Sequence, residues 1–209
     1  MQNVKFHFAF FFVLVSLGLN LPNASASEIS PSEMIDEFHG TLLKVMKNAK
    51  SLSAKERYEK LEHALDRAFE FKFMVRLASG ISWSKASKQH RSYLTQAFRR
   101  MSIATYAYRF KSYSDQRFVT IKTAPGMRQT KLVFTKVVSP SKNGKDDITK
   151  LTYVTKKFGP VWKIIDILLA GGISELSVRY SEYRATLRTK GALGLARILN
   201  KKADELISD

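Results

Sequence analysis

Asp166 is the acidic residue of this chain whose surroundings could give it catalytic chemistry. It lies in the apolar segment VWKIIDILL, residues 161–169. A carboxylate buried among apolar side chains must be paired or protonated, and a raised pKa would suit a general base. The structural alternative is a salt bridge to a helix arginine such as Arg76 or Arg179. Because no second acid–base group accompanies Asp166 in the sequence, we favour the structural role.

The histidines do not form a catalytic or metal-binding pattern. His39, His63 and His90 occur singly on predicted helices, without the i, i+4 spacing of a helical metal site, and the chain has no cysteine. No serine lies in a nucleophile elbow, and no glycine pair fits a phosphate-binding or dinucleotide-binding loop. We therefore expect partly exposed helix histidines, no catalytic residue, no metal and no cofactor.

The N-terminal segment has the layout of a secretory signal peptide. Lys5 precedes an apolar run at residues 9–21, and Ala24 and Ala26 occupy the two positions that determine cleavage. Cleavage after Ala26 would leave residues 27–209 as a single domain. An uncleaved membrane anchor is the alternative, but the apolar run is shorter than the roughly 20 residues that span a bilayer.

The chain is strongly basic, with 35 Lys and Arg against 18 Asp and Glu. Loss of Lys5 with the signal peptide leaves 34 basic residues and a net charge of +16. Such a charge in the cytosol would indicate nucleic acid, whereas an exported chain meets anionic lipid headgroups, where each basic side chain contributes about 1 kcal/mol. A basic surface that only confers solubility is the alternative. The absence of cysteine excludes disulfides and favours the periplasm for an exported chain.

Capping signals and apolar periodicity predict helices on both sides of the strand-rich region. Ser30 with Glu33 and Ser53 with Glu56 form two capping boxes. Residues 69–83 are dense in aromatic and aliphatic side chains, and a longer helix follows residue 87. Two glycines at 171 and 172 precede a further helix, which Gly191 interrupts. The apolar stripe of the long helix comprises Leu94, Ala97, Phe98, Met101, Ala104, Thr105 and Tyr108.

Four strands are predicted between these helical regions, at residues 117–122, 130–138, 147–158 and 161–169. Their short connections indicate an antiparallel meander, and the last strand is apolar enough on both faces to be central and covered on each side. The order of elements predicts an α+β domain, with a curved antiparallel sheet of about four strands covered by N- and C-terminal helices. Strict alternation would place on one face of the last strand Trp162, Ile164, Asp166 and Leu168.

A sheet covered in this way can be packed solid or can enclose an apolar ligand cavity, and the periodicity is compatible with both. The candidates for the lining of such a cavity are the apolar residues expected to face the helices or the sheet. They are Phe73, Leu77, Phe98, Met101, Leu151, Tyr153, Trp162, Ile164 and Leu168.

Ordered motifs along the chain resemble those of the MlaC family, also called the toluene-tolerance family, of periplasmic phospholipid-binding proteins. Residues 69–83 match the signature F-D-x-x-x-M-x-R-x-x-x-G-x-x-W, with Glu70 in place of the usual Asp. Residues 162–166 match a W-[KR]-[IV]-x-D strand. Further matches lie at residues 105–113, 181–183 and 191–195, so that the motifs together cover most of the chain after residue 26.

Within the family, residues 172–176 look more like the hopanoid-associated (HpnM-like) branch than the phospholipid-shuttle branch. Ala170 stands where an acidic or polar residue is common, and Tyr180 stands where arginine usually precedes Ser-Glu. These departures concern the identity of the cargo more than the fold.

The resemblance implies a periplasmic lipid carrier and not an enzyme. Such a carrier would hold the acyl chains of a glycerophospholipid in an apolar pocket, because each methylene exposed to water costs about 0.8 kcal/mol. The implied partners are an outer-membrane lipoprotein complex and an inner-membrane ABC transporter with an MCE-domain ring, with transient contact to anionic membrane and none to nucleic acid. Two alternatives stay open: a small enzyme of the same cone-shaped architecture with Asp166 as base, and a basic envelope adaptor with a solid core.

Overall fold

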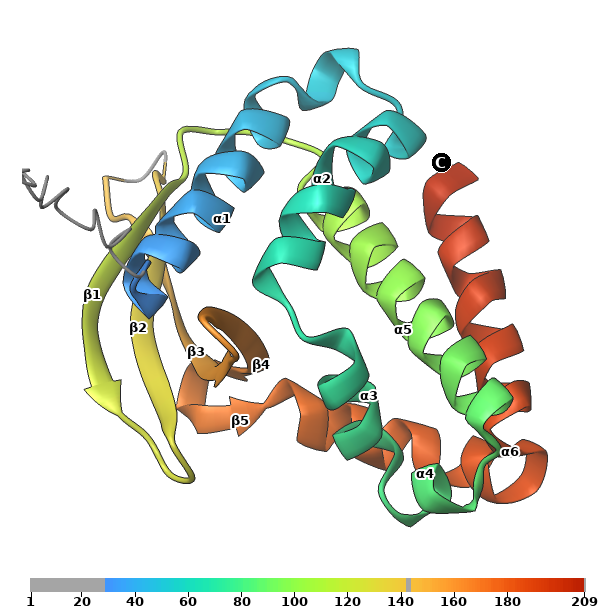
Figure 1. Cartoon of the computed structure of the whole chain (residues 1–209). Coiled ribbons are helices and arrows are strands. Elements are labelled where there is room, and N and C mark those ends of the chain that lie inside the picture. Colours follow the sequence, from blue (N-terminus) through green and yellow to red (C-terminus); the bar gives the residue numbers. More distant parts are fainter. Residues whose placement is uncertain (1–28, 142–143, 209) are drawn as a thin grey trace, which may run out of the picture.

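The computed structural model describes residues 29–141 and 144–208 (Figure 1). The predicted signal peptide and its cleavage site after residue 26 lie outside these residues. Helices α1 (Pro31–Lys47) and α2 (Ala54–Ala68) both begin in capping boxes, as predicted, and the 3-10 turn η1 (Ala49–Ser51) lies between them. At α1, the Glu33 N–H donates to Ser30 Oγ at 3.2 Å, and the Ser30 N–H donates to the Glu33 carboxylate at 2.7 Å.

The aromatic segment folds into two short helices, α3 (Phe71–Ser79) and α4 (Ile81–Lys85), on either side of Gly80. Gly80 has a positive φ of 51°, which explains the turn at this position. Helix α5 (Lys88–Arg109) then begins at the Ser87 cap and buries Phe98 in the core. Its predicted apolar stripe is wrong at Tyr108, which is 37% exposed near the C-terminal end of the helix.

The sheet is an antiparallel meander in the order β1-β2-β3-β4-β5 and is not closed (Figure 1). The first four strands are those predicted; the fifth, of two residues, pairs with the end of β4. The prediction that the fourth strand is central and covered on each side is wrong. Strand β4 pairs with β5 only at Leu168 and Leu169, and Val161 and Leu169 at its ends are 49% and 41% exposed. The strand bounds are β1 Arg117–Pro125, β2 Thr130–Ser139, β3 Asp147–Phe158, β4 Val161–Leu169 and β5 Ile173–Ser174, with the 3-10 turn η2 (Ala170–Gly172) before β5.

A β-bulge at Ile165 breaks the alternation that the sequence predicts for β4. Ile164 pairs with Thr155, but Asp166 pairs with Val154, so Ile165 is the extra residue. Because residues 153 and 155 of β3 share one face, Ile164 and Ile167 both face the helices. The prediction that Asp166 and Leu168 share the face of Ile164 is therefore wrong: both lie on the opposite, outer face.

Helix α6 (Glu175–Ser208) completes the domain and changes direction at Gly191, where the sequence predicts a break. Its C-terminal part runs beside α5, and the helices lie together on one side of the sheet (Figure 1). The core between helices and sheet includes Phe38, Leu65, Phe98, Ile164 and Leu199, all at most 4% exposed. Within the described part of the chain, no helix combines the length and the apolar character needed to cross a bilayer.

Candidate functional site

A cavity of about 120 Å³ lies between the sheet and the helices α3, α5 and α6. Its wall is mostly aromatic and aliphatic, and the strands β1 to β4 each contribute at least one residue to it. The lining residues are Phe69, Phe71, Met74, Phe98, Met101, Ser102, Thr105, Tyr106, Arg109, Phe110, Phe118, Val137, Leu151, Tyr153, Ile167, Leu169, Glu175, Leu176, Arg179 and Tyr183.

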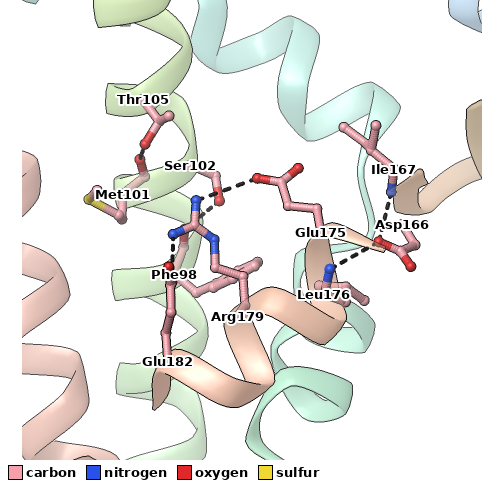
Figure 2. A network of polar contacts seen from close by, with 10 residues as sticks. All are labelled: Phe98, Met101, Ser102, Thr105, Asp166, Ile167, Glu175, Leu176, Arg179 and Glu182. Atoms are coloured by element: carbon pink, nitrogen blue, oxygen red, sulfur yellow. Dashed lines mark hydrogen bonds and ion pairs between the residues drawn. The ribbon is translucent and has the colours of Figure 1, made fainter. Parts of the chain in front are cut away.

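Three charged side chains belong to the cavity wall, and all three are at least partly exposed to solvent: Arg109, Glu175 and Arg179. Arg109 is exposed, and Arg179 extends from α6 towards α5 (Figure 2). The Arg179 guanidinium lies 3.4 Å from Glu175 and 3.2 Å from Glu182. Burial lowers the pKa of Arg179, but Tyr183 and the two carboxylates outweigh this effect, so its net pKa is raised. Arg179 therefore keeps its charge beside the apolar wall.

Three tyrosines are among the polar residues of the cavity wall. Burial raises the pKa of Tyr106 and Tyr153, and it raises the pKa of Tyr183 to about 12, so all three stay neutral. The Tyr153 hydroxyl is hydrogen-bonded to His39 Nε2 of α1 at 2.9 Å. The expectation that His39 is partly exposed is wrong: it is 3% exposed, whereas His63 is exposed and His90 half-buried.

Asp166 lies outside the cavity wall and holds the start of α6. One carboxylate oxygen accepts hydrogen bonds from the N–H groups of Ile167 at 2.8 Å and Leu176 at 3.1 Å (Figure 2). The other accepts from the Ser174 hydroxyl at 2.5 Å, and Ser174 Oγ in turn accepts from the Ser177 N–H. Asp166 thus acts as a cap for the helix N-terminus, in place of the predicted salt bridge to Arg76 or Arg179.

Substitutions at Asp166 should therefore change stability in proportion to the lost hydrogen bonds. Asp166→Ala removes three acceptor contacts and is expected to lower the free energy of unfolding by about 1–3 kcal/mol. Asp166→Asn keeps the oxygen that accepts from the two N–H groups, but it replaces the acceptor of the Ser174 hydroxyl with an NH2 group and removes the charge at the helix N-terminus. Its cost should therefore be smaller than that of alanine, about 0.5–1.5 kcal/mol. Urea unfolding of both variants measures the difference. An alanine variant as stable as the asparagine variant would contradict the capping role.

The structure brings together only some of the residues predicted to line a cavity. Phe98, Met101, Leu151 and Tyr153 lie in the cavity wall. The other five lie elsewhere, and the reasons differ. Phe73 packs against Phe158, Leu77 is 47% exposed, Trp162 lines a second cavity, Ile164 is fully buried in the core, and Leu168 lines a groove on the outer face of the sheet.

The second cavity, of about 250 Å³, lies between α1, α2 and the start of β4. Three aromatic rings separate it from the first cavity. Phe38 lines the second cavity, and its ring packs edge-on against Phe69 at 5.4 Å and Tyr106 at 5.7 Å, both of which line the first. The remaining lining residues are Ile29, Met34, Glu37, Ala64, Arg67, Ala68, Pro160, Val161, Trp162 and Lys163.

Several wall residues were not among the sequence candidates. Ile167 was missed because the bulge at Ile165 reverses its direction, which no residue pattern in the strand indicates. Tyr106 and Phe110 could have been found, since both belong to a motif that resembles the MlaC family. In the described ranges, no group of three His, Asp or Glu side chains could hold a metal ion.

Comparison with known proteins agrees with this geometry. Residues 36–201 match the family described as MlaC protein. The chain belongs to the MlaC family. Its fold is similar to that of the phospholipid-binding protein from Ralstonia solanacearum, solved in complex with a phospholipid, with a TM-score of 0.69 and 19% identity over 87% of this chain and 99% of that chain. No curated protein sequence matches the chain at a significant level.

Proposed function

We propose that this MlaC-family protein is a periplasmic carrier that binds a glycerophospholipid with its acyl chains in the cavity between helices and sheet. The observation that carries the proposal is the aromatic and aliphatic cavity with two arginines at its border. The family, and the phospholipid named for the similar structure, support the same choice of ligand. Burial of each methylene contributes about 0.8 kcal/mol, so binding needs no covalent step.

The charged residues of the cavity wall suit the headgroup of such a lipid. Arg109 and Arg179 can offer charge-assisted hydrogen bonds to a phosphate, while the tyrosine-rich wall suits the acyl chains. The cavity volume of about 120 Å³ is below the roughly 300–1,000 Å³ of ordinary ligand pockets, so acyl chains would enter only as the helices move apart from the sheet.

The proposed carrier exchanges lipid with complexes in the two membranes of the envelope. The partners are an outer-membrane lipoprotein complex and an inner-membrane ABC transporter with an MCE-domain ring, as the family resemblance implies. The net charge of +16 that remains after loss of Lys5 favours contact with anionic surfaces at both membranes. Hopanoid-type lipids remain the alternative cargo, and extraction of lipids from protein purified from its own host distinguishes the two.

Filling the cavity should abolish lipid binding. Leu151→Trp on β3 places an indole in the cavity wall, and we expect native mass spectrometry of residues 27–209 to show at least a tenfold loss of bound phospholipid. Thr149→Trp is the matched control, because Thr149 is exposed, lies two residues away on β3 and is not part of the cavity wall. Wild-type protein that never carries lipid, or a Leu151→Trp variant that carries as much as the control, would refute the proposal.

A further inference from the structure

The connection between β4 and α6 is an exposed apolar loop. Residues 169–173, here called the 169–173 loop, are Leu-Ala-Gly-Gly-Ile, all of them exposed and none charged. Leu169 and Ile173 face each other across the β4–β5 pair and are 41% and 56% exposed. Exposed apolar side chains are unfavourable in water, and their burial in a membrane interface is favourable.

The loop lies at the border between the cavity and the outer face of the sheet. Leu169 is part of the cavity wall, and Glu175 and Arg179, just beyond the loop, belong to it as well. On its other side, residues 169–172 line a groove of about 460 Å³ across the outer face. The apolar residues of that groove are Ile121, Leu132, Phe134, Ile148, Leu151, Leu168 and Leu169.

Basic side chains flank the loop on both sides. Arg109 lies in the cavity wall, and Lys150 lines the outer groove and pairs with Lys136 in the β2–β3 ladder. None of these three side chains forms an ion pair with another described residue. Among the nearby acids, Glu175 and Glu182 share the single positive charge of Arg179, and Asp166 contacts only neutral donors. Two negative charges are therefore left uncompensated, against the three unpaired cations. The surface around the loop therefore complements an anionic partner.

We propose that the 169–173 loop inserts into the headgroup region of an anionic phospholipid bilayer and so places the cavity beside the acyl chains. An apolar tip between unpaired cations matches a bilayer, which offers negative charge at its surface and hydrocarbon beneath it. An acidic protein partner would satisfy the lysines but would not require a charge-free loop at the border of the cavity. This inference rests on the proposed function, and the experiment distinguishes failure of the membrane contact from failure of the proposed function.

The test measures binding of residues 27–209 to vesicles of phosphatidylethanolamine with phosphatidylglycerol, compared with vesicles of phosphatidylcholine. We expect sedimentation with the anionic vesicles that weakens as salt is raised, because the cations are exposed. Ile173→Asp should weaken this binding at least tenfold, since burial of one isoleucine is equivalent to about a tenfold change in affinity or more. Lys150→Glu should weaken it for anionic vesicles only.

Ile81→Asp is the matched control, because Ile81 is 71% exposed and belongs to α4, a helix that lies apart from β5 and the 169–173 loop (Figure 1). Vesicle binding that is equally strong in the Ile173→Asp and Ile81→Asp variants, or absent from the wild type, overturns the inference. Native mass spectrometry of the same preparations measures the bound phospholipid, and so tests the proposed function separately from the membrane contact. If the wild type holds phospholipid but Ile173→Asp leaves vesicle binding unchanged, only the membrane contact is refuted. If the wild type never holds phospholipid, the proposed function is refuted.

Discussion

Phe38→Ala is expected to lower the free energy of unfolding by about 3–5 kcal/mol, the usual cost of removing a buried phenylalanine ring. Phe38 is 3% exposed and forms edge-on contacts with Phe69 and Tyr106. Because its ring separates the two cavities, the truncation joins them into one larger apolar space. Urea unfolding of lipid-free protein measures the loss, which is a large fraction of the stability of an ordinary domain.

The same substitution has a consequence for ligand binding. A ligand that binds only the folded state stabilises it, so phospholipid in the enlarged cavity should restore part of the lost stability. Phe73→Ala provides the control, since Phe73 is half-buried and lines neither cavity. Phe73→Ala should lower the free energy of unfolding by less than Phe38→Ala does, and it should leave the amount of bound lipid unchanged. Equal losses of stability in the two variants would show that Phe38 does not hold the partition between the cavities.

Acidification from pH 7 to pH 4 is expected to remove roughly 3 kcal/mol of stability through His39 alone. Burial lowers the pKa of His39 from 6.5 to about 4, and the nearby charge of Asp36 offsets this only in part. The folded protein therefore binds this proton less readily than the unfolded chain does. The contribution is complete above about pH 6.5 and is lost as the pH falls towards 4, below which both states are protonated.

His39→Gln isolates this effect, because glutamine can still form a hydrogen bond with Tyr153 but does not titrate. Urea unfolding at several pH values between 7 and 4 should show a flatter dependence for this variant than for the wild type. His63→Gln, at an exposed position on α2, should leave the dependence unchanged. Parallel pH curves for wild type and His39→Gln would contradict the prediction.

Local signals in the sequence predicted the elements of this fold well, because each depends on residues near one another in the chain. The serine–glutamate pairs at Ser30 and Ser53 form capping boxes within four residues, and Gly191 breaks α6 at its own backbone. The short connections with turn residues are sufficient for an antiparallel meander. The ordered motifs likewise indicated the MlaC family, which the match over residues 36–201 confirms.

The candidate site was only partly predictable, since its wall is assembled from segments far apart in the chain. Phe98 and Met101 were found from the stripe of one helix, and Leu151 and Tyr153 from the alternation of one regular strand. Leu77 and Trp162 were chosen from the faces on which the sequence pattern placed them. In the structure Leu77 is 47% exposed on α3, and Trp162 lines the second cavity, beside α1 and α2.

The sequence by itself therefore determined the helices, the meander and the family, through caps, turns and periodicity that act over a few residues. Only the tertiary structure decided which side of β4 faces the cavity, because the bulge at Ile165 depends on pairing with β3. It also decided the roles of two polar residues. His39 is buried because Tyr153 and Phe118 of the sheet cover it, and Asp166 becomes a helix cap because β5 brings Ser174 and Leu176 to its carboxylate.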